Sequence, residues 1–121
     1  MTPFQTLKGF KDLLPEEASR WEHIFALAKS TFDVYGFSMI STPIMEPTEL
    51  FTRSIGAGTD IVEKEMYTFD DYGKKVSLRP EGTACAVRAY LEHPCLSQLT
   101  PAKLYYIGPM FRYERPQAGR R

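Results

Sequence analysis

Apolar residues recur at alternating steps of three and four between Pro15 and Gly36. This spacing is typical of a helix with one buried face. Pro15 suits the first helical position, and Gly36 can end the helix. We therefore predict a helix that packs one face on a sheet, and the residues of this face are Ala18, Trp21, Phe25, Ala28, Phe32 and Tyr35.

Residues 36–47, with the sequence GFSMISTPIMEP, combine β-forming residues with two prolines. Because Pro43 and Pro47 cannot donate to a central ladder, we predict an edge strand or an interface segment. A short helix capped by Thr48 should follow, and then a loop, IGAGTD, at residues 55–60. The glycines of this loop match neither GxxxxGK[ST] nor GxGxxG, so we do not predict a phosphate-binding loop of those kinds.

The sequence DDYG at residues 70–73 separates two β-type segments, which predicts a hairpin. The next helix should begin at Pro80, carry Glu81 in its first turn and end before Pro94. Its expected buried residues are Ala84, Val87 and Leu91. Residues 103–114, KLYYIGPMFRYE, are rich in aromatic residues and form the strongest strand candidate.

Side chains alternate along a strand, so the two faces of this last segment are predicted to differ. We expect one face to be core, formed by Tyr105, Ile107, Phe111 and Tyr113. The other face carries Arg112 and Glu114, and Gly108 leaves room in front of them. Arg112 could hold a phosphate through two parallel hydrogen bonds, and Glu114 could accept one from an amine. The alternative is an exposed ion pair worth less than about 1 kcal/mol.

The sequence RPEGT at residues 79–83 allows two interpretations. The Glu81 carboxylate could complement the dipole of the helix that begins there. Alternatively, Glu81 and Thr83 could accept hydrogen bonds from the ammonium group of a ligand. His23 and His93 are isolated in the sequence and are interpreted as ordinary surface or partly packed residues.

The composition is that of a single globular domain, with 121 residues, 43% hydrophobic and 25% charged. Fifteen Lys and Arg balance fifteen Asp and Glu, so no global field favours nucleic acid or a membrane. Positive charge is concentrated in residues 112–121, where the net charge is +3. Cys85 and Cys95 have no disulfide or zinc-site spacing, and no apolar run could span a membrane or act as a signal. A cytoplasmic protein without a metal site is predicted.

Several stretches, taken together and in order, resemble the N-terminal half of the catalytic domain of histidyl-tRNA synthetases. These are GFKDLLPEEASRWEHI, STPIMEPTELFTRSIGAGTDIVEKEMYTF, SLRPEGTACAVRAYLEH and YYIGPMFRYERPQAGR. GTDIVEKEMYTF together with FRYERPQAGR distinguishes this family from other class II synthetases. The resemblance implies an α+β fold, part of the class II aminoacyl-tRNA synthetase catalytic core, with an antiparallel sheet flanked by helices. It also implies a cytoplasmic homodimer.

The resemblance assigns motif 1 to about residues 37–47, with Pro43 at the dimer interface, and motif 2 to about residues 104–121. Arg112 would be the catalytic residue and would contact the α-phosphate of ATP. Glu114 would contact the adenine amine, and Arg120 the outer phosphates, which Mg²⁺ would bridge.

The other substrates would contact two further pairs of residues. Glu81 and Thr83 would hold the α-amino group of histidine, while Arg115 and Gln117 would contact the acceptor end of tRNA(His). The implied reaction is that of a histidine–tRNA ligase: activation of histidine by ATP to histidyl-adenylate, then transfer to tRNA(His).

The chain is expected to be an N-terminal part of the catalytic domain that stops within motif 2. Motif 3, a histidine-specific loop and the anticodon-binding domain are absent from it, so the piece itself should be catalytically incomplete. An unpaired strand edge should make it oligomeric or marginally stable. Two alternatives are a non-catalytic regulatory subunit of ATP phosphoribosyltransferase and a generic nucleic-acid-binding module. The intact FRYERPQAGR and RPEGT favour the ligase over the first, and the zero net charge disfavours the second.

Overall fold

The structure is a computed structural model that describes residues 3–55 and 65–113, without the side chains of Ser54 and Ile55. The chain forms two compact units, of which the first comprises Met1–Gly36 and the second begins at Phe37. The loop predicted at residues 55–60 falls mostly outside the described residues.

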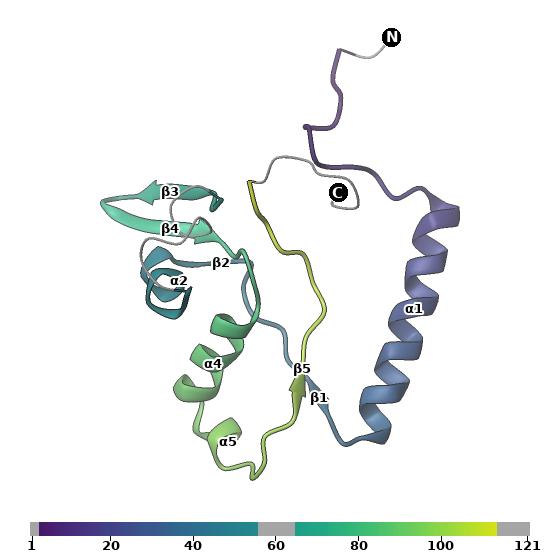
Figure 1. Ribbon diagram of the computed structural model, residues 1–121, viewed down its shortest axis with the longest axis vertical. Coiled ribbons are helices and arrows are strands. Elements are labelled where there is room, and N and C mark those ends of the chain that lie inside the picture. The colour runs from purple at the N-terminus through teal and green to yellow at the C-terminus, as the bar shows by residue number, and fades with distance from the viewer. Residues whose placement is uncertain (1–2, 56–64, 114–121) are drawn as a thin grey trace. The chain divides into compact units, whose positions relative to one another are not determined.

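The first unit contains one long helix, α1, at Pro15–Val34 (Figure 1). Pro15 occupies the first turn, and Gly36 follows the helix with φ of 78°, a left-handed conformation that glycine adopts readily. The predicted helix is therefore confirmed. None of its residues is buried, and Trp21 and Phe25 contact each other with ring centroids 5.8 Å apart. That its apolar face packs on a sheet stays a prediction.

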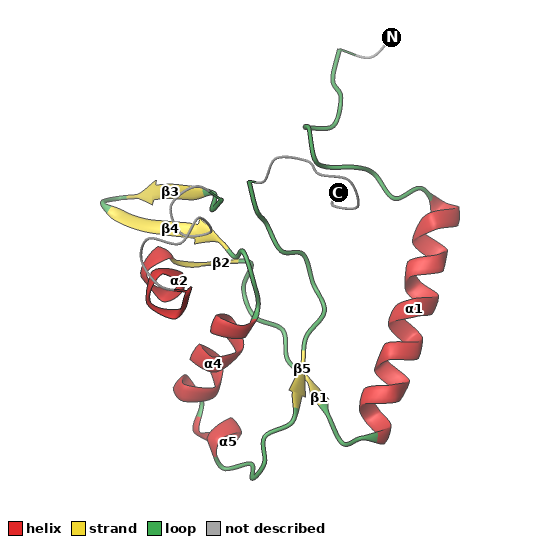
Figure 2. Cartoon of the chain, in the orientation of Figure 1, coloured by secondary structure: helices red, strands yellow, loops and turns green. Residues whose placement is uncertain are grey.

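The second unit contains a three-stranded antiparallel sheet (Figure 2). Its strands are β2 at Met45–Pro47, β4 at Lys74–Leu78 and β3 at Thr68–Asp71, in the order β2-β4-β3. Tyr72 and Gly73 join β3 to β4 with φ of 50° and 86°, as a two-residue hairpin turn requires. Both the hairpin and the proline-containing edge strand are thus confirmed.

A separate parallel pair joins β1 at Ser38–Met39 to β5 at Leu104–Tyr105. The predicted strand over residues 103–114 is therefore mostly wrong, because β5 is only 2 residues long. Beyond β5 the backbone makes isolated hydrogen bonds, from Phe111 N–H to the Arg79 carbonyl (2.8 Å) and from Tyr113 N–H to the Glu65 carbonyl (2.7 Å). Pro109 also lacks the N–H that a ladder would use.

The predicted alternation of faces fails in the same segment. Tyr105 is buried and Phe111 is half-buried, but Ile107 and Tyr113 are 37% and 68% exposed. The rings of Tyr113 and Tyr67 make a T-shaped contact, with centroids 5.8 Å apart and planes at 86°. Without a regular ladder, strand periodicity does not decide which of these side chains are covered.

Among the described residues, three helices complete the unit: α2 at Thr48–Ile55, α4 at Thr83–Glu92 and α5 at Pro94–Ser97. The core lies between α2 and α4 and consists of Phe51, Ala84 and Cys85, with Leu50 and Met66 packed against it. The Thr48 hydroxyl lies 2.7 Å from the Ser77 hydroxyl, so it bridges to β4 and was wrongly predicted to act as a cap. The expected α+β fold, an antiparallel sheet with flanking helices, is confirmed.

Helix α4 differs from its prediction in two respects. It begins at Thr83, because Pro80 is fully buried and the backbone turns into the helix only after Gly82. Its buried residues are Ala84, Cys85 and Ala89, whereas Val87 and Leu91 are 51% and 75% exposed. Only Ala84 of the three predicted core positions is correct.

Candidate functional site

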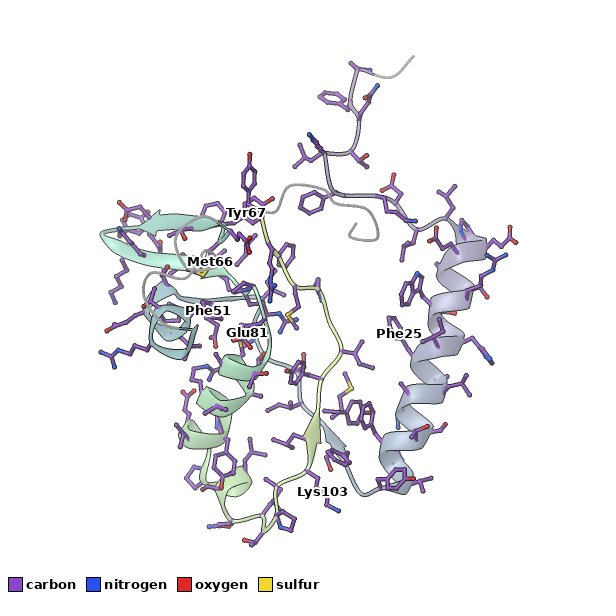
Figure 3. The ribbon with its side chains drawn as sticks, viewed as in Figure 1. Phe25, Phe51, Met66, Tyr67, Glu81 and Lys103 are labelled. Atoms are coloured by element: carbon purple, nitrogen blue, oxygen red, sulfur yellow. The ribbon has the colours of Figure 1, made fainter. Side chains whose placement is uncertain are left out.

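The junction between β4 and α4, where Glu81 is labelled in Figure 3, brings together most of the predicted site residues that the structure describes. Glu81 lies at this junction, and its carboxylate accepts hydrogen bonds from the backbone N–H groups of Thr83 (2.6 Å) and Ala84 (3.1 Å). The carboxylate therefore satisfies donors that the helix itself leaves free. Two ionised oxygens offer about four acceptor positions, so Glu81 can cap the helix and still bind an ammonium group.

Tyr106 covers the backbone of this junction. A Cβ atom on Gly82 would overlap the Tyr106 ring and lie 2.8 Å from Cζ, so only glycine fits beneath it. The Tyr106 hydroxyl lies 3.2 Å from the Thr83 hydroxyl. Sequence reasoning did not select Tyr106, although the glycine between Glu81 and Thr83 is a signal that something approaches closely.

Arg112 reaches the same junction from the segment after β5. Its Nε donates to the Pro80 carbonyl at 2.9 Å, which places the base of the guanidinium one residue from Glu81 in the chain. The side chain of Arg112 remains exposed. Glu81, Thr83 and Arg112, predicted from separate motifs, therefore belong to one region.

Arg79 is a charged residue of this region that sequence reasoning missed. It is only 5% exposed, and Nε donates to the Pro109 carbonyl at 2.9 Å. Nη1 donates to the carbonyl and the hydroxyl of Thr42, at 3.2 and 3.1 Å. Gly108 makes room for this guanidinium, since a Cβ there would lie 2.5 Å from Nη2. Arg79 therefore fills the space beside Gly108. The prediction that Gly108 leaves room in front of Arg112 and Glu114 is wrong for Arg112, and Glu114 lies outside the described residues.

A second group of charges lies farther along α4. Arg88 binds the buried carboxylate of Glu46 through Nε and the exposed one of Glu92 through Nη1, both at 2.6 Å. Burial lowers the pKa of Arg88, but the hydrogen bonds and charges of the two carboxylates outweigh it and raise the pKa above its usual value.

An open pocket of about 600 Å³ lies over this second group. Pro43, Arg88 and His93 are among the residues that line it. The prediction that Pro43 lies at a dimer interface stays a prediction.

Cys85 packs directly behind Glu81, and its thiol lies 3.8 Å from the Glu81 carbonyl. Burial, followed by the negative charges of Glu46 and Glu81, raises the pKa of this thiol, against the opposing effect of Arg79. The thiol is therefore neutral near pH 7 and belongs to the core.

Four predicted site residues, Glu114, Arg115, Gln117 and Arg120, lie outside the described residues. Within residues 3–55 and 65–113, no group of three or more His, Cys, Asp or Glu side chains could hold a metal ion. No helix in this described part is both long and apolar enough to cross a membrane.

A family model described as histidyl-tRNA synthetase matches residues 9–121. The chain belongs to the histidyl-tRNA synthetase family. Among curated relatives of this family, the histidine–tRNA ligase of Geobacter sulfurreducens is 62% identical over 115 residues, which are 94% of this chain and 28% of the relative. The histidine–tRNA ligase of a Synechococcus species is 58% identical over 121 residues, which are 99% of this chain and 28% of the relative.

Solved structures agree with membership of the histidyl-tRNA synthetase family. The apo histidyl-tRNA synthetase of S. aureus is 41% identical with a TM-score of 0.77, covering 91% of this chain and 30% of that one. A Bacillus halodurans protein titled ATP phosphoribosyltransferase regulatory subunit/histidyl-tRNA synthetase is 23% identical with a TM-score of 0.79, covering 95% of this chain and 29% of that one. At that identity the second likeness shows the fold alone.

Proposed function

We propose that this chain supplies part of the active site of a histidine–tRNA ligase. The observation that carries the proposal is the meeting of Glu81, Thr83 and Arg112 at the β4–α4 junction. The regulatory-subunit alternative has weaker support, because relatives 54–62% identical are named histidine–tRNA ligase.

The amino acid would bind at the start of α4. The Glu81 carboxylate keeps acceptor capacity after capping the helix, so it can receive the ammonium group of histidine, with the Thr83 hydroxyl beside it. This arrangement would direct the histidine carboxylate away from Glu81, because like charges repel.

Arg112 would act on the phosphate side of the reaction. A carboxylate oxygen of histidine attacks the α-phosphorus of ATP, the bond to the bridging oxygen breaks, and pyrophosphate leaves. Two anions must approach each other in this step, and Arg112 can stabilise the charge that grows on the phosphoryl oxygens. Its Nε donates to the Pro80 carbonyl, and the planar guanidinium carries five N–H donors in all, a geometry that suits phosphate.

The remaining roles come from family membership. Glu114 would contact the adenine amine, Arg120 the outer phosphates, and Arg115 with Gln117 the tRNA(His) acceptor end. Mg²⁺ would neutralise charge on the outer phosphates when it binds with ATP. A homodimer in the cytoplasm, with Pro43 at the subunit interface, completes the proposal.

Histidine-dependent ATP–pyrophosphate exchange tests the proposal. It should be measured on this chain alone and on a chimeric ligase, the Geobacter sulfurreducens enzyme with its matching segment replaced by this chain. In the chimeric ligase, Arg112→Ala is expected to lower the exchange rate by about 10²–10³. The matched control is Arg53→Ala on the exposed surface of α2, which should exchange normally. Near-normal exchange by Arg112→Ala would refute its role.

A further inference from the structure

Three segments distant in the sequence meet at one buried guanidinium. Arg79 directly follows β4, Thr42 lies between β1 and β2, and Pro109 lies beyond β5. The Arg79 backbone takes part as well, because its N–H donates to the Ile44 carbonyl and its carbonyl accepts from Phe111 N–H, both at 2.8 Å. A single residue thus binds residues 42–44 on one side and residues 109–111 on the other.

The acceptors around Arg79 are neutral oxygens. Within the part of the chain that the structure describes, no ion pair joins Arg79 to a carboxylate. Burying a charge is costly unless it is well hydrogen-bonded, so the carbonyls of Thr42 and Pro109 must supply that compensation. Lysine could not replace this set of bonds, because a guanidinium spreads its donors over a planar fork and an ammonium does not.

The position of Arg112 depends on the segment that the Arg79 guanidinium holds. Phe111, bound to the Arg79 carbonyl, directly precedes Arg112, and Arg112 itself donates to the carbonyl of Pro80, the residue after Arg79. The two ends of the segment 108–112 are therefore attached to the same turn of the β4–α4 junction.

We propose that Arg79 is a positioning residue, whose guanidinium places Arg112 over the start of α4. The inference rests on the proposed function for the role of Arg112, although the hydrogen bonds themselves do not. Arg79 does not touch the reacting groups in this arrangement. Its effect on the reaction passes through the segment 108–112.

The first test is a double-mutant cycle for ATP–pyrophosphate exchange in the chimeric ligase. Arg79→Lys should lower kcat about 10–100-fold and change the KM for histidine less than about threefold, because misplacing a group that acts in the transition state affects kcat. Adding Arg79→Lys to Arg112→Ala should cause no further loss. Arg53→Lys is the matched control and should be normal. Equal losses in both backgrounds, or normal kcat in Arg79→Lys, would overturn the inference.

Gly108→Ala tests the same contact without changing Arg79. The new methyl group should displace the guanidinium and lower kcat by a similar factor, about tenfold or more. In the Arg79→Lys background the ammonium no longer fills that space, so Gly108→Ala should add little. An equal effect in both backgrounds would contradict the contact.

Hydrogen exchange separates this inference from the proposed function. In the chimeric ligase, Arg79→Lys should speed amide exchange at least about tenfold in a peptide covering residues 104–113, with residues 68–76 unchanged. If the chimeric ligase without further substitutions shows no pyrophosphate exchange, the proposed function fails. The amide-exchange measurement then decides by itself whether Arg79 positions residues 108–112. Unchanged protection in residues 104–113 would overturn it.

Discussion

The charged side chains beside helix α4 have different kinds of partner at its start and in its middle. At the start, Arg79 is buried among carbonyl oxygens, and the Glu81 carboxylate accepts from backbone N–H groups. In the middle, Arg88 lies between two carboxylates that neutralise it, those of Glu46 and Glu92. Within the described residues, no ion pair neutralises Arg79 or Glu81, whereas Arg88 and its two carboxylates neutralise one another.

If the proposed function holds, this difference separates residues that are expected to support the reaction from residues that are expected to support the fold. An ionic group whose partner is another ion loses much of its field at a distance, and removing one partner destabilises the fold because the other charge is left uncompensated. Charges compensated only by dipoles remain able to attract a substrate of opposite sign. We therefore expect substitutions at the start of α4 to affect activity and substitutions in the middle to affect stability.

In the contrast between the two regions of α4, the largest effect should come from Glu81→Gln. Glutamine retains an oxygen that can cap α4 but loses the charge that would bind the ammonium group, so kcat/KM for histidine should fall about 10²-fold. The free energy of unfolding should fall by only about 0.3–1 kcal/mol. Exchange kinetics and urea unfolding of the chimeric ligase measure the two effects, with Glu92→Gln as the control. A normal KM for histidine would remove Glu81 from the site.

Glu46→Ala should have the opposite profile. It leaves the half-buried Arg88 without its buried partner, so the free energy of unfolding should fall by about 2 kcal/mol, below the cost of breaking a fully buried pair. Pyrophosphate exchange below the unfolding temperature should change less than threefold. Activity loss without destabilisation would break the contrast between the two regions of α4.

A smaller effect is expected from Gly82→Ala. The added methyl group overlaps the Tyr106 ring, and overpacking of this kind costs about 1–2 kcal/mol. Thermal unfolding measures the change. In the Tyr106→Ala background, Gly82→Ala should lower the free energy of unfolding much less. An unchanged loss there would show that the Tyr106 ring is not the group that excludes a side chain at position 82.

The smallest effect concerns Cys85 and pH. Its raised pKa in the folded chain means that the unfolded thiol loses its proton first as pH rises. The resulting contribution to stability is complete below the unfolded pKa and is lost as pH rises through the folded one. In native protein at pH 8, iodoacetamide should label the exposed Cys95 and spare Cys85. Equal labelling of both thiols would show that Cys85 is accessible.

Local chemistry made part of the structure predictable. The hairpin follows from a two-residue turn ending in Gly73, and the edge strand follows from Pro47. Both depend on the conformations that neighbouring residues allow. The Glu81 carboxylate accepts from a backbone N–H at the start of α4, as expected of an acidic residue that complements the helix dipole, whereas its role in a binding site stays a prediction.

Long-range contacts explain the errors. The segment after β5 has strand-forming residues, but its hydrogen bonds go singly to Arg79 and Glu65, which no local pattern reveals. Arg79 is the first residue of RPEGT, but nothing in that motif signals its burial, since its acceptors lie 37 and 30 residues away. The face of α4 was misjudged for the same reason, because the spacing of Val87 and Leu91 did not reveal that packing would cover Cys85 and Ala89 instead.

The bonds of Arg79 also bear on the order in which the chain folds. The hairpin β3–β4 needs only neighbouring residues, so it can form early, whereas the guanidinium must wait for residues 42 and 109 together. During synthesis from the N-terminus, Arg79 stays hydrated until Pro109 has left the ribosome. We therefore expect the β4–α4 junction to be assembled last, after the hairpin beside it has formed.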